Sequence, residues 1–137
     1  MAGNDPAILL VDDSQTLRRI AAKVLRDLGY RRVYQASDGK EALEHLRARR
    51  IDLVISDWNM PGATGLDLLK AVRGDAGLKS LPFIMLTAEG QKENILAAIR
   101  ADVTQYVTKP FTAEVLARKI GRAMAKSASG GCEEAGS

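Results

Sequence analysis

Five short runs rich in apolar residues alternate with longer stretches in which apolar residues recur every three or four positions. The runs Ala7–Val11, Leu53–Ile55 and Phe83–Leu86 are apolar at consecutive positions, a pattern typical of strands buried on both faces of a parallel sheet. The runs Arg32–Ala36 and Thr104–Thr108 are more polar and are expected nearer the edges of the sheet.

The stretches between the runs predict amphipathic helices, because apolar residues spaced by three and four positions fall on one helical face. Asp38, Thr64 and Thr112 are expected to cap the second, third and fifth helices, and Gly29 is expected to end the first. The residues expected on the five apolar faces are, in chain order, Leu17, Ile20, Ala21, Val24, Leu25 and Leu28; Ala42, Leu43 and Leu46; Leu66, Leu69 and Val72; Ile95, Ala98 and Ile99; and Leu116, Ile120, Ala123 and Met124. Gly121 lies inside the last of them, where glycine costs about 1 kcal/mol relative to alanine.

This alternation predicts a doubly wound α/β fold in which right-handed helical crossovers join parallel strands. For five strands we expect the flavodoxin-like (βα)5 arrangement, with strand order 2-1-3-4-5. Residues 1–126 are expected to form one domain, and residues 127–137 a flexible tail of small and polar residues.

Composition narrows the class of protein without defining its function. The 137 residues carry a formal net charge of +3 and are 46% hydrophobic, which suits one compact domain with its own core. The basic residues form no dense block, so no binding to nucleic acid is expected. The first apolar run is too short for a signal peptide or a membrane span, and Cys132 is the only cysteine. We therefore expect a cytoplasmic protein that does not associate with membranes.

Residues that carry chemistry stand where four of the five expected strands end. Asp12 and Asp13 follow the first strand, Asp57 ends the third, Thr87 the fourth and Lys109 the fifth. The carboxyl ends of parallel strands meet at one edge of the sheet, where ligands bind in open α/β folds, so these residues are expected to lie together. Each of them alone is also explained as a turn, capping or solvated residue, and the interpretation as a site depends on the whole set.

Three carboxylates at one edge repel one another, and a hard divalent cation removes that penalty. Oxygen ligands with open positions for water and phosphate suit Mg²⁺. The backbone carbonyl of Asn59 is expected to join Asp12, Asp13 and Asp57 as a ligand. With no histidine or cysteine near the set, zinc is disfavoured.

Magnesium beside a carboxylate indicates phosphoryl transfer, with Asp57 as the nucleophile that forms an acyl phosphate. Lys109 would neutralise one phosphoryl oxygen, and the Thr87 hydroxyl would donate a hydrogen bond to another. Asn59 and Glu89 flank this position in the sequence and are expected to tune the rate of hydrolysis.

Several segments resemble response-regulator receiver domains: Val11-Asp12-Asp13, Ser56-Asp57-Trp58-Asn59-Met60-Pro61, Leu86-Thr87-Ala88-Glu89 and Lys109-Pro110-Phe111. The closer similarity is to the CheY type of chemotaxis regulator, and it includes Leu17-Arg18-Arg19-Ile20 and Lys92-Glu93-Asn94-Ile95. These motifs occur in the family's order and at compatible spacings. The resemblance covers residues 7 to about 126.

The resemblance implies that Asp57 receives its phosphoryl group from a phosphohistidine on a CheA-like sensor kinase. It implies a switch in which the Thr87 hydroxyl moves toward the phosphoryl group and Tyr106 turns inward. It also implies that the surface of the fourth helix, fifth strand and fifth helix, including Gly90, Tyr106 and Lys119, then binds a FliM-like flagellar switch protein. We expect a monomeric phosphoacceptor, not an enzyme with a separate substrate, that promotes its own phosphorylation and dephosphorylation, with a phosphatase as a further partner.

Three departures and three alternatives stay open. Asp102 stands in a turn where the family has glycine, and Thr108 and Gly121 differ from the CheY pattern near the expected output surface. The chain is alternatively a phosphate sink or relay carrier without a motor target, or a receiver taken from a DNA-binding regulator. A hydrolase with an aspartate nucleophile is a third alternative, which the lack of an evident second acid or base disfavours.

Overall fold

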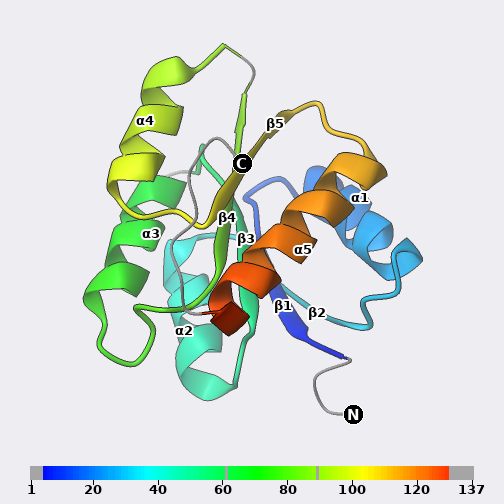
Figure 1. The fold of residues 1–137 in the computed structure, drawn as a ribbon, viewed down its shortest axis with the longest axis horizontal. Helices are drawn as coiled ribbons and strands as arrows, with labels where there is room; N and C mark the ends of the chain where they lie inside the picture. The colour runs from blue at the N-terminus through cyan, green and yellow to red at the C-terminus, as the bar shows by residue number, and fades with distance from the viewer. Residues whose placement is uncertain (1–4, 61, 89, 130–137) are drawn as a thin grey trace.

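The computed structural model describes residues 5–60, 62–88 and 90–129, and it forms a layered α/β sandwich (Figure 1). The strands are β1 (Ala7–Val11), β2 (Arg32–Ala36), β3 (Leu53–Asp57), β4 (Phe83–Ala88) and β5 (Gln105–Lys109). The helices are α1 (Gln15–Asp27), α2 (Gly39–Ala48), α3 (Gly65–Gly74), α4 (Lys92–Arg100) and α5 (Ala113–Ser129). Strand and helix alternate throughout, as predicted.

The five strands form one parallel sheet in the order β2-β1-β3-β4-β5. Helices α1 and α5 cover one face of this sheet, and α2, α3 and α4 cover the other (Figure 1). This is the flavodoxin-like arrangement predicted from the sequence. The reversal of strand order lies between β1 and β3, so ligands are expected beyond the carboxyl ends of these two strands.

Two apolar cores, one on each face of the sheet, hold the layers together. Leu9 of β1 belongs to the core beneath α2 and α3, whereas its neighbours Ile8 and Leu10 belong to the core beneath α1 and α5. Every residue of β1 and β3 is buried, whereas β2 and β5 at the sheet edges are only partly buried. The consecutive apolar runs therefore mark the central strands because both of their faces are covered.

Two strands extend past the apolar runs that predicted them. Ser56 pairs with Val11 and Met85, and Asp57 pairs with Leu86, so β3 includes both polar residues. Strand β4 likewise continues through Thr87 to Ala88. The ladder of backbone hydrogen bonds does not depend on side-chain polarity, and it brings the reactive groups to the rim of the sheet on rigid strands.

Most helices begin at the capping residues that the sequence indicates. Asp38 accepts a hydrogen bond from the Glu41 backbone N–H at 2.8 Å, and Thr112 accepts one from Val115 at 3.1 Å. Thr64 forms a capping box with Asp67. Such caps satisfy backbone donors that have no partner within the helix, and they fix where each loop beyond a strand becomes a helix.

Asp102 adopts the left-handed conformation, with φ of 68°, in the turn between α4 and β5. The Arg73 guanidinium donates from Nε to the Asp102 carbonyl oxygen at 2.8 Å and from Nη2 to the Thr104 hydroxyl at 3.2 Å. Arg73 also binds the carbonyl oxygens of Lys79 and Leu81. Burial lowers the pKa of Arg73. One side chain of α3 thus holds two loops, and Asp102 adopts a conformation that glycine favours and that aspartate tolerates.

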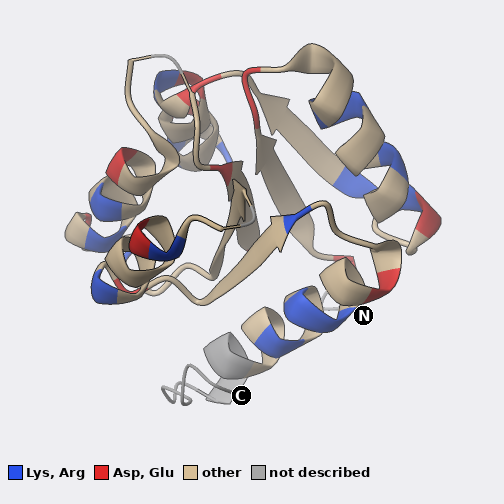
Figure 2. Cartoon of the chain, turned by 90° about the horizontal axis from the view of Figure 1, so that it is seen from above, with Lys and Arg blue, Asp and Glu red and all other residues tan. Residues whose placement is uncertain are grey.

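Lysine and arginine gather on the two helices that cover one face (Figure 2). Helix α1 carries four basic residues and one acidic residue, and α5 carries the same numbers. This layer is therefore strongly positive, although the whole chain has a net charge of only +3. No helix in the described ranges has the length and apolar character needed to cross a bilayer.

Helix α5 runs to Ser129, three residues beyond the expected end of the domain at residue 126. The boundary between the domain and the tail stays a prediction, because residues 130–137, with Cys132, lie outside the described residues. Gly121 lies inside this helix, as expected. Its backbone keeps helical geometry, and a Cβ added there would meet no atom within 4 Å.

Replacing Gly121 with alanine is expected to stabilise the protein by about 1 kcal/mol, because the unfolded chain loses conformational freedom and the folded chain gains no clash. Gly65→Ala is the matched opposite case. A Cβ at Gly65 would lie 2.3 Å from the Asp57 carbonyl oxygen, so this variant should be destabilised. Urea unfolding followed by circular dichroism measures both. Equal effects of the two substitutions would contradict the packing described for these positions.

Candidate functional site

Three carboxylates meet beyond the carboxyl ends of β1 and β3. Val11 pairs with Ser56 in these neighbouring strands, so Asp12 and Asp57 follow at the same level of the sheet. Carboxylate oxygens of Asp12, Asp13 and Asp57 all lie within 4.8 Å of one another. Asp12 and Asp57 are buried and Asp13 is exposed. The predicted cluster is therefore formed by the parallel register, with one member open to solvent.

The loop after β1 is fixed by hydrogen bonds from α1. Ser14 caps this helix, and its backbone N–H donates to Asp12 Oδ1 at 2.9 Å. Arg18 donates from Nη1 to the Asp12 carbonyl oxygen at 2.6 Å and from Nε to Gln35 Oε1 at 3.0 Å. The loop thus holds the Asp12 carboxylate toward the site.

Burial raises the pKa of Asp12 above its ordinary value. The nearby charges of Asp57 and Asp13 add to this rise, while the hydrogen bond from Ser14 and the charge of Lys109 oppose it. The ionised form of Asp12 is therefore costly in the protein alone. A cation bound between the carboxylates would remove that cost.

Lys109 reaches Asp57 across strand β4. Its Nζ donates to Asp57 Oδ1, and the Lys109 side chain is 30% exposed while that of Asp57 is 6% exposed. The other oxygen, Asp57 Oδ2, accepts the backbone N–H of Asn59 at 3.1 Å. The Lys109–Pro110 peptide bond is cis. Both oxygens of the central carboxylate are thus held in place by donors.

Thr87 is buried in β4 between the strands that carry Asp57 and Lys109. Its Oγ1 has no hydrogen-bond partner among the residues that the structure describes. An unpaired buried hydroxyl costs on the order of 1–3 kcal/mol, and such groups in a native fold call for a functional explanation. A phosphoryl oxygen added to the neighbouring Asp57 would supply an acceptor.

The donor set fits a hard divalent cation. Every candidate ligand is an oxygen, and one lysine does not balance three carboxylates. The cavity over these groups has a volume of about 520 Å³ and includes Asn59 in its lining, which leaves room for water and a phosphoryl group. Asp12, Asp13 and Asp57 would hold the ion, and the Asn59 carbonyl stays a predicted ligand.

The expected output residues lie apart from this cluster. Tyr106 of β5 is half-buried, and Lys119 Nζ of α5 lies 5.2 Å from the centre of its ring. Burial lowers the pKa of Lys119, with a further contribution from the charges of Arg122 and Arg118. Gly90 is exposed, with φ of 87°. The remaining predicted residue near the site, Glu89, lies outside the described residues.

One supporting residue was missed from the sequence. The Gly65 backbone N–H donates to the Trp58 carbonyl oxygen at 2.8 Å, and any side chain at Gly65 would collide with the Asp57 backbone. The only sequence signal is a glycine directly after the capping residue Thr64. Such a glycine has many explanations, and its close approach to the acceptor strand is visible only in three dimensions.

Comparison with protein families and with solved structures agrees with this geometry. The model of the response regulator receiver domain matches residues 8–121. The chemotaxis protein CheY of Pseudomonas aeruginosa is 52% identical over 113 residues, which are 82% of this chain and 91% of that protein. CheY-3 of Vibrio cholerae is 49% identical over 115 residues, covering 84% of this chain and 88% of that protein.

Among solved structures, a putative response regulator from Chloroflexus aurantiacus superposes with a TM-score of 0.85 at 35% identity, covering 88% of this chain and 98% of that chain. The chemotaxis protein CheY4 of Vibrio cholerae gives a TM-score of 0.80 at 38% identity, covering 87% of this chain and 98% of that chain. Fold and sequence therefore point to the same family.

Addition of Mg²⁺ is expected to change the fluorescence of Trp58, the single tryptophan, because it follows Asp57 directly in the chain. Asp13→Asn should weaken the apparent Mg²⁺ affinity by about tenfold or more through loss of one anionic ligand. Glu44→Gln on α2 makes the same charge change on an exposed residue away from the site and should bind as the unaltered protein does. An affinity unchanged in Asp13→Asn would contradict the assignment.

Asp12→Asn is expected to raise the free energy of unfolding in metal-free buffer at neutral pH. The raised pKa of Asp12 means that the unfolded chain ionises first as pH rises, so the fold loses stability through that interval and stays weakened above it. The amide keeps an acceptor for the Ser14 N–H but carries no charge. The gain should shrink in acid, where Asp12 is protonated, and Mg²⁺ should stabilise the unaltered protein more. Denaturation in EDTA and in Mg²⁺ measures this, and equal stability in EDTA would contradict it.

Proposed function

Since this chain belongs to the response regulator receiver domain family, we propose that it is a phosphorylation-activated switch in which Asp57 accepts the phosphoryl group. The observation that carries this proposal is that hydrogen bonds fix the orientation of the Asp57 carboxylate. Its two carboxylate oxygens are bound by Lys109 and by the Asn59 backbone, beside Asp12 and Asp13. A buried carboxylate in fixed orientation is positioned to attack phosphorus.

The phosphoryl group would pass from a ring nitrogen of a phosphohistidine, on a CheA-like sensor kinase, to a carboxylate oxygen of Asp57. The N–P bond breaks as the O–P bond forms, and the histidine keeps the electron pair. Bound Mg²⁺ would supply positive charge to the transferring oxygens. Lys109 would move its hydrogen bond from Asp57 to a phosphoryl oxygen, and the Thr87 hydroxyl would donate to another.

The change at Thr87 would carry the signal outward. Its hydroxyl is buried without a partner in the described chain, so it would move toward a phosphoryl oxygen that can accept its hydrogen bond. Tyr106, half-buried in β5 beside the chain of Lys119, would turn inward as Thr87 moves. The surface of α4, β5 and α5, with Gly90, Tyr106 and Lys119, would then present a different shape to a partner.

Relatives that share about half of the sequence are named chemotaxis proteins, which supports a FliM-like flagellar switch protein as the partner.

We place the protein in the cytoplasm as a monomer. Return to the resting state would follow attack of water on phosphorus, with release of inorganic phosphate and with Asn59 and Glu89 tuning the rate. A dedicated phosphatase is a further expected partner. The main alternative is a sink or relay carrier with the same chemistry and no motor target.

Acetyl phosphate with Mg²⁺ is expected to phosphorylate the protein, and Asp57→Asn should abolish the shifted band on a phosphate-affinity gel. Thr87→Val should still accept phosphate but should lose phosphorylation-dependent binding to a FliM N-terminal peptide. Thr16→Val, the same substitution at an exposed position of α1 outside the α4-β5-α5 surface, is the matched control and should bind.

The outcomes separate the parts of the proposal. Phosphorylation of the Asp57→Asn variant would show that another residue accepts the phosphoryl group. Peptide binding by the phosphorylated Thr87→Val variant would show that Thr87 has no role in the switch. Phosphorylation of the unaltered protein with rapid phosphate loss and no peptide binding would favour the sink.

A further inference from the structure

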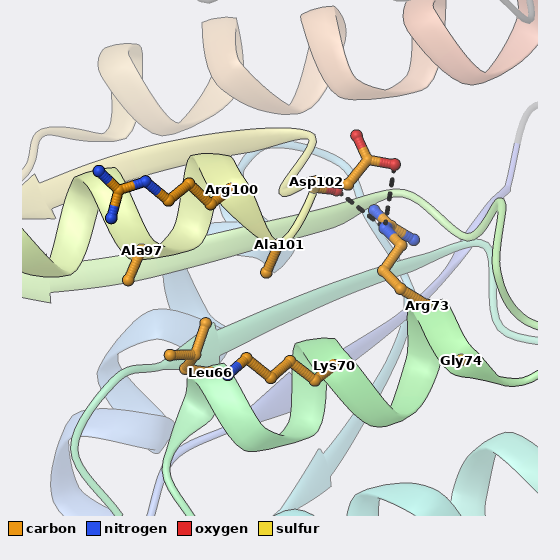
Figure 3. A pocket seen from close by; sticks show the side chains of 8 residues that line it. All are labelled: Leu66, Lys70, Arg73, Gly74, Ala97, Arg100, Ala101 and Asp102. Carbon is orange, nitrogen blue, oxygen red and sulfur yellow. Dashed lines mark hydrogen bonds and ion pairs between the residues drawn. The ribbon is translucent and has the colours of Figure 1, made fainter.

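A second concave site lies between helices α3 and α4, away from the three carboxylates. It has a volume of about 680 Å³ and is lined by Leu66, Lys70 and Arg73 of α3 and by Ala97 and Arg100 of α4, among others (Figure 3). This volume falls within the range of sites that bind small ligands. We call it the α3–α4 groove.

The lining of the groove carries more positive charge than its one acidic residue neutralises. Its lining contains three basic side chains, Lys70, Arg73 and Arg100, and one acidic residue, Asp102. The Asp102 carboxylate lies 3.8 Å from Arg73 Nε and turns toward that guanidinium (Figure 3). No salt bridge joins Lys70 or Arg100 to any residue within the ranges 5–60, 62–88 and 90–129.

Arg73 contributes charge to the groove but has little freedom to bind a ligand. Its side chain is 15% exposed, and its guanidinium donates to three backbone carbonyl oxygens and to Thr104. Lys70 and Arg100 are exposed and retain their donors. The groove therefore combines one fixed, partly buried cation with two exposed cations that form no salt bridge within the described part of the chain, an arrangement that favours a multivalent anion.

The shape of the groove adds a second requirement. Lys70 and Arg100 extend in the same direction along its two walls, toward the end where Leu66 and Ala97 lie (Figure 3). Small residues, including Gly74 and Ala101, line the remainder. If the anionic group of a ligand lies between the two long side chains, the rest of the ligand would contact Leu66 and Ala97, where an apolar or planar group is favoured.

We propose that the α3–α4 groove binds a small phosphate-bearing ligand, with its phosphate groups between Lys70 and Arg100. Free pyrophosphate and the diphosphate of a nucleotide share this chemistry. The proposal does not depend on phosphorylation of Asp57, because the lining of the groove includes none of the three clustered carboxylates.

Nuclear magnetic resonance titration of the full Asp57→Asn chain with sodium pyrophosphate tests the proposal. EDTA keeps the carboxylate cluster free of metal and therefore unfavourable to anions. Low salt limits the screening of the exposed charges in the groove. We expect saturable amide shifts over residues 66–74 and 97–102. Lys70→Gln and Arg100→Gln should each weaken binding by roughly threefold to fivefold, the loss of one exposed charge contact. Lys70→Gln with Arg100→Gln together should abolish it.

Lys40→Gln is the matched control, because Lys40 is an exposed lysine of α2 outside the groove. This variant should bind pyrophosphate with the same affinity as the unaltered chain. A parallel titration with adenosine diphosphate separates the two sources of phosphate. If adenosine diphosphate binds more tightly than pyrophosphate, the ligand is a nucleotide whose base packs on Leu66. Equal affinities for the two compounds support a free phosphate compound. Absence of saturable shifts, or shifts that persist in the double variant, would overturn the proposal.

Discussion

Repulsion among three carboxylates is the constraint on which the rest of the site depends. The parallel register of β1 and β3 forces Asp12 and Asp57 to the same level, and Asp13 follows on the adjoining loop. Left alone, these charges oppose folding, and their repulsion adds to the rise in the pKa of Asp12 that burial causes. Lys109 offsets part of it from the far side of β4. The remaining negative charge makes the site receptive to a cation.

The apolar cores make this arrangement possible. With both faces of β1 and β3 covered by helices, the central strands are too well packed to shift when charge accumulates at their ends. Loops then need little structure of their own. Short side-chain contacts, such as Arg18 to the Asp12 carbonyl, are sufficient to aim the groups on the loop after β1, while Asp57, Thr87 and Lys109 lie on rigid strands.

Strand order, helix positions and the clustering of Asp12, Asp57, Thr87 and Lys109 at one edge could be predicted because they follow from local patterns and from the geometry of parallel sheets. Gly65 and Arg73 could not. The first matters through a steric approach to a strand eight residues away in sequence, and the second through carbonyl oxygens up to 29 residues away. Neither leaves a periodic or compositional trace. The end of β3 at Asp57 was predicted, whereas β4 continues one residue past its expected end at Thr87, to Ala88.

The Thr87 hydroxyl, which has no hydrogen-bond partner among the described residues, has a consequence for protein engineering. An apolar residue of similar shape would relieve the resting fold of an unsatisfied group, so selection for thermostability alone would favour its replacement. Under the proposed function, selection for signalling would act in the opposite direction, because the hydroxyl would donate a hydrogen bond to the phosphoryl group on Asp57. Variants recovered from a heat-resistance screen would therefore include proteins that fold better and transmit nothing, and stability-guided redesign of this chain should hold position 87 fixed.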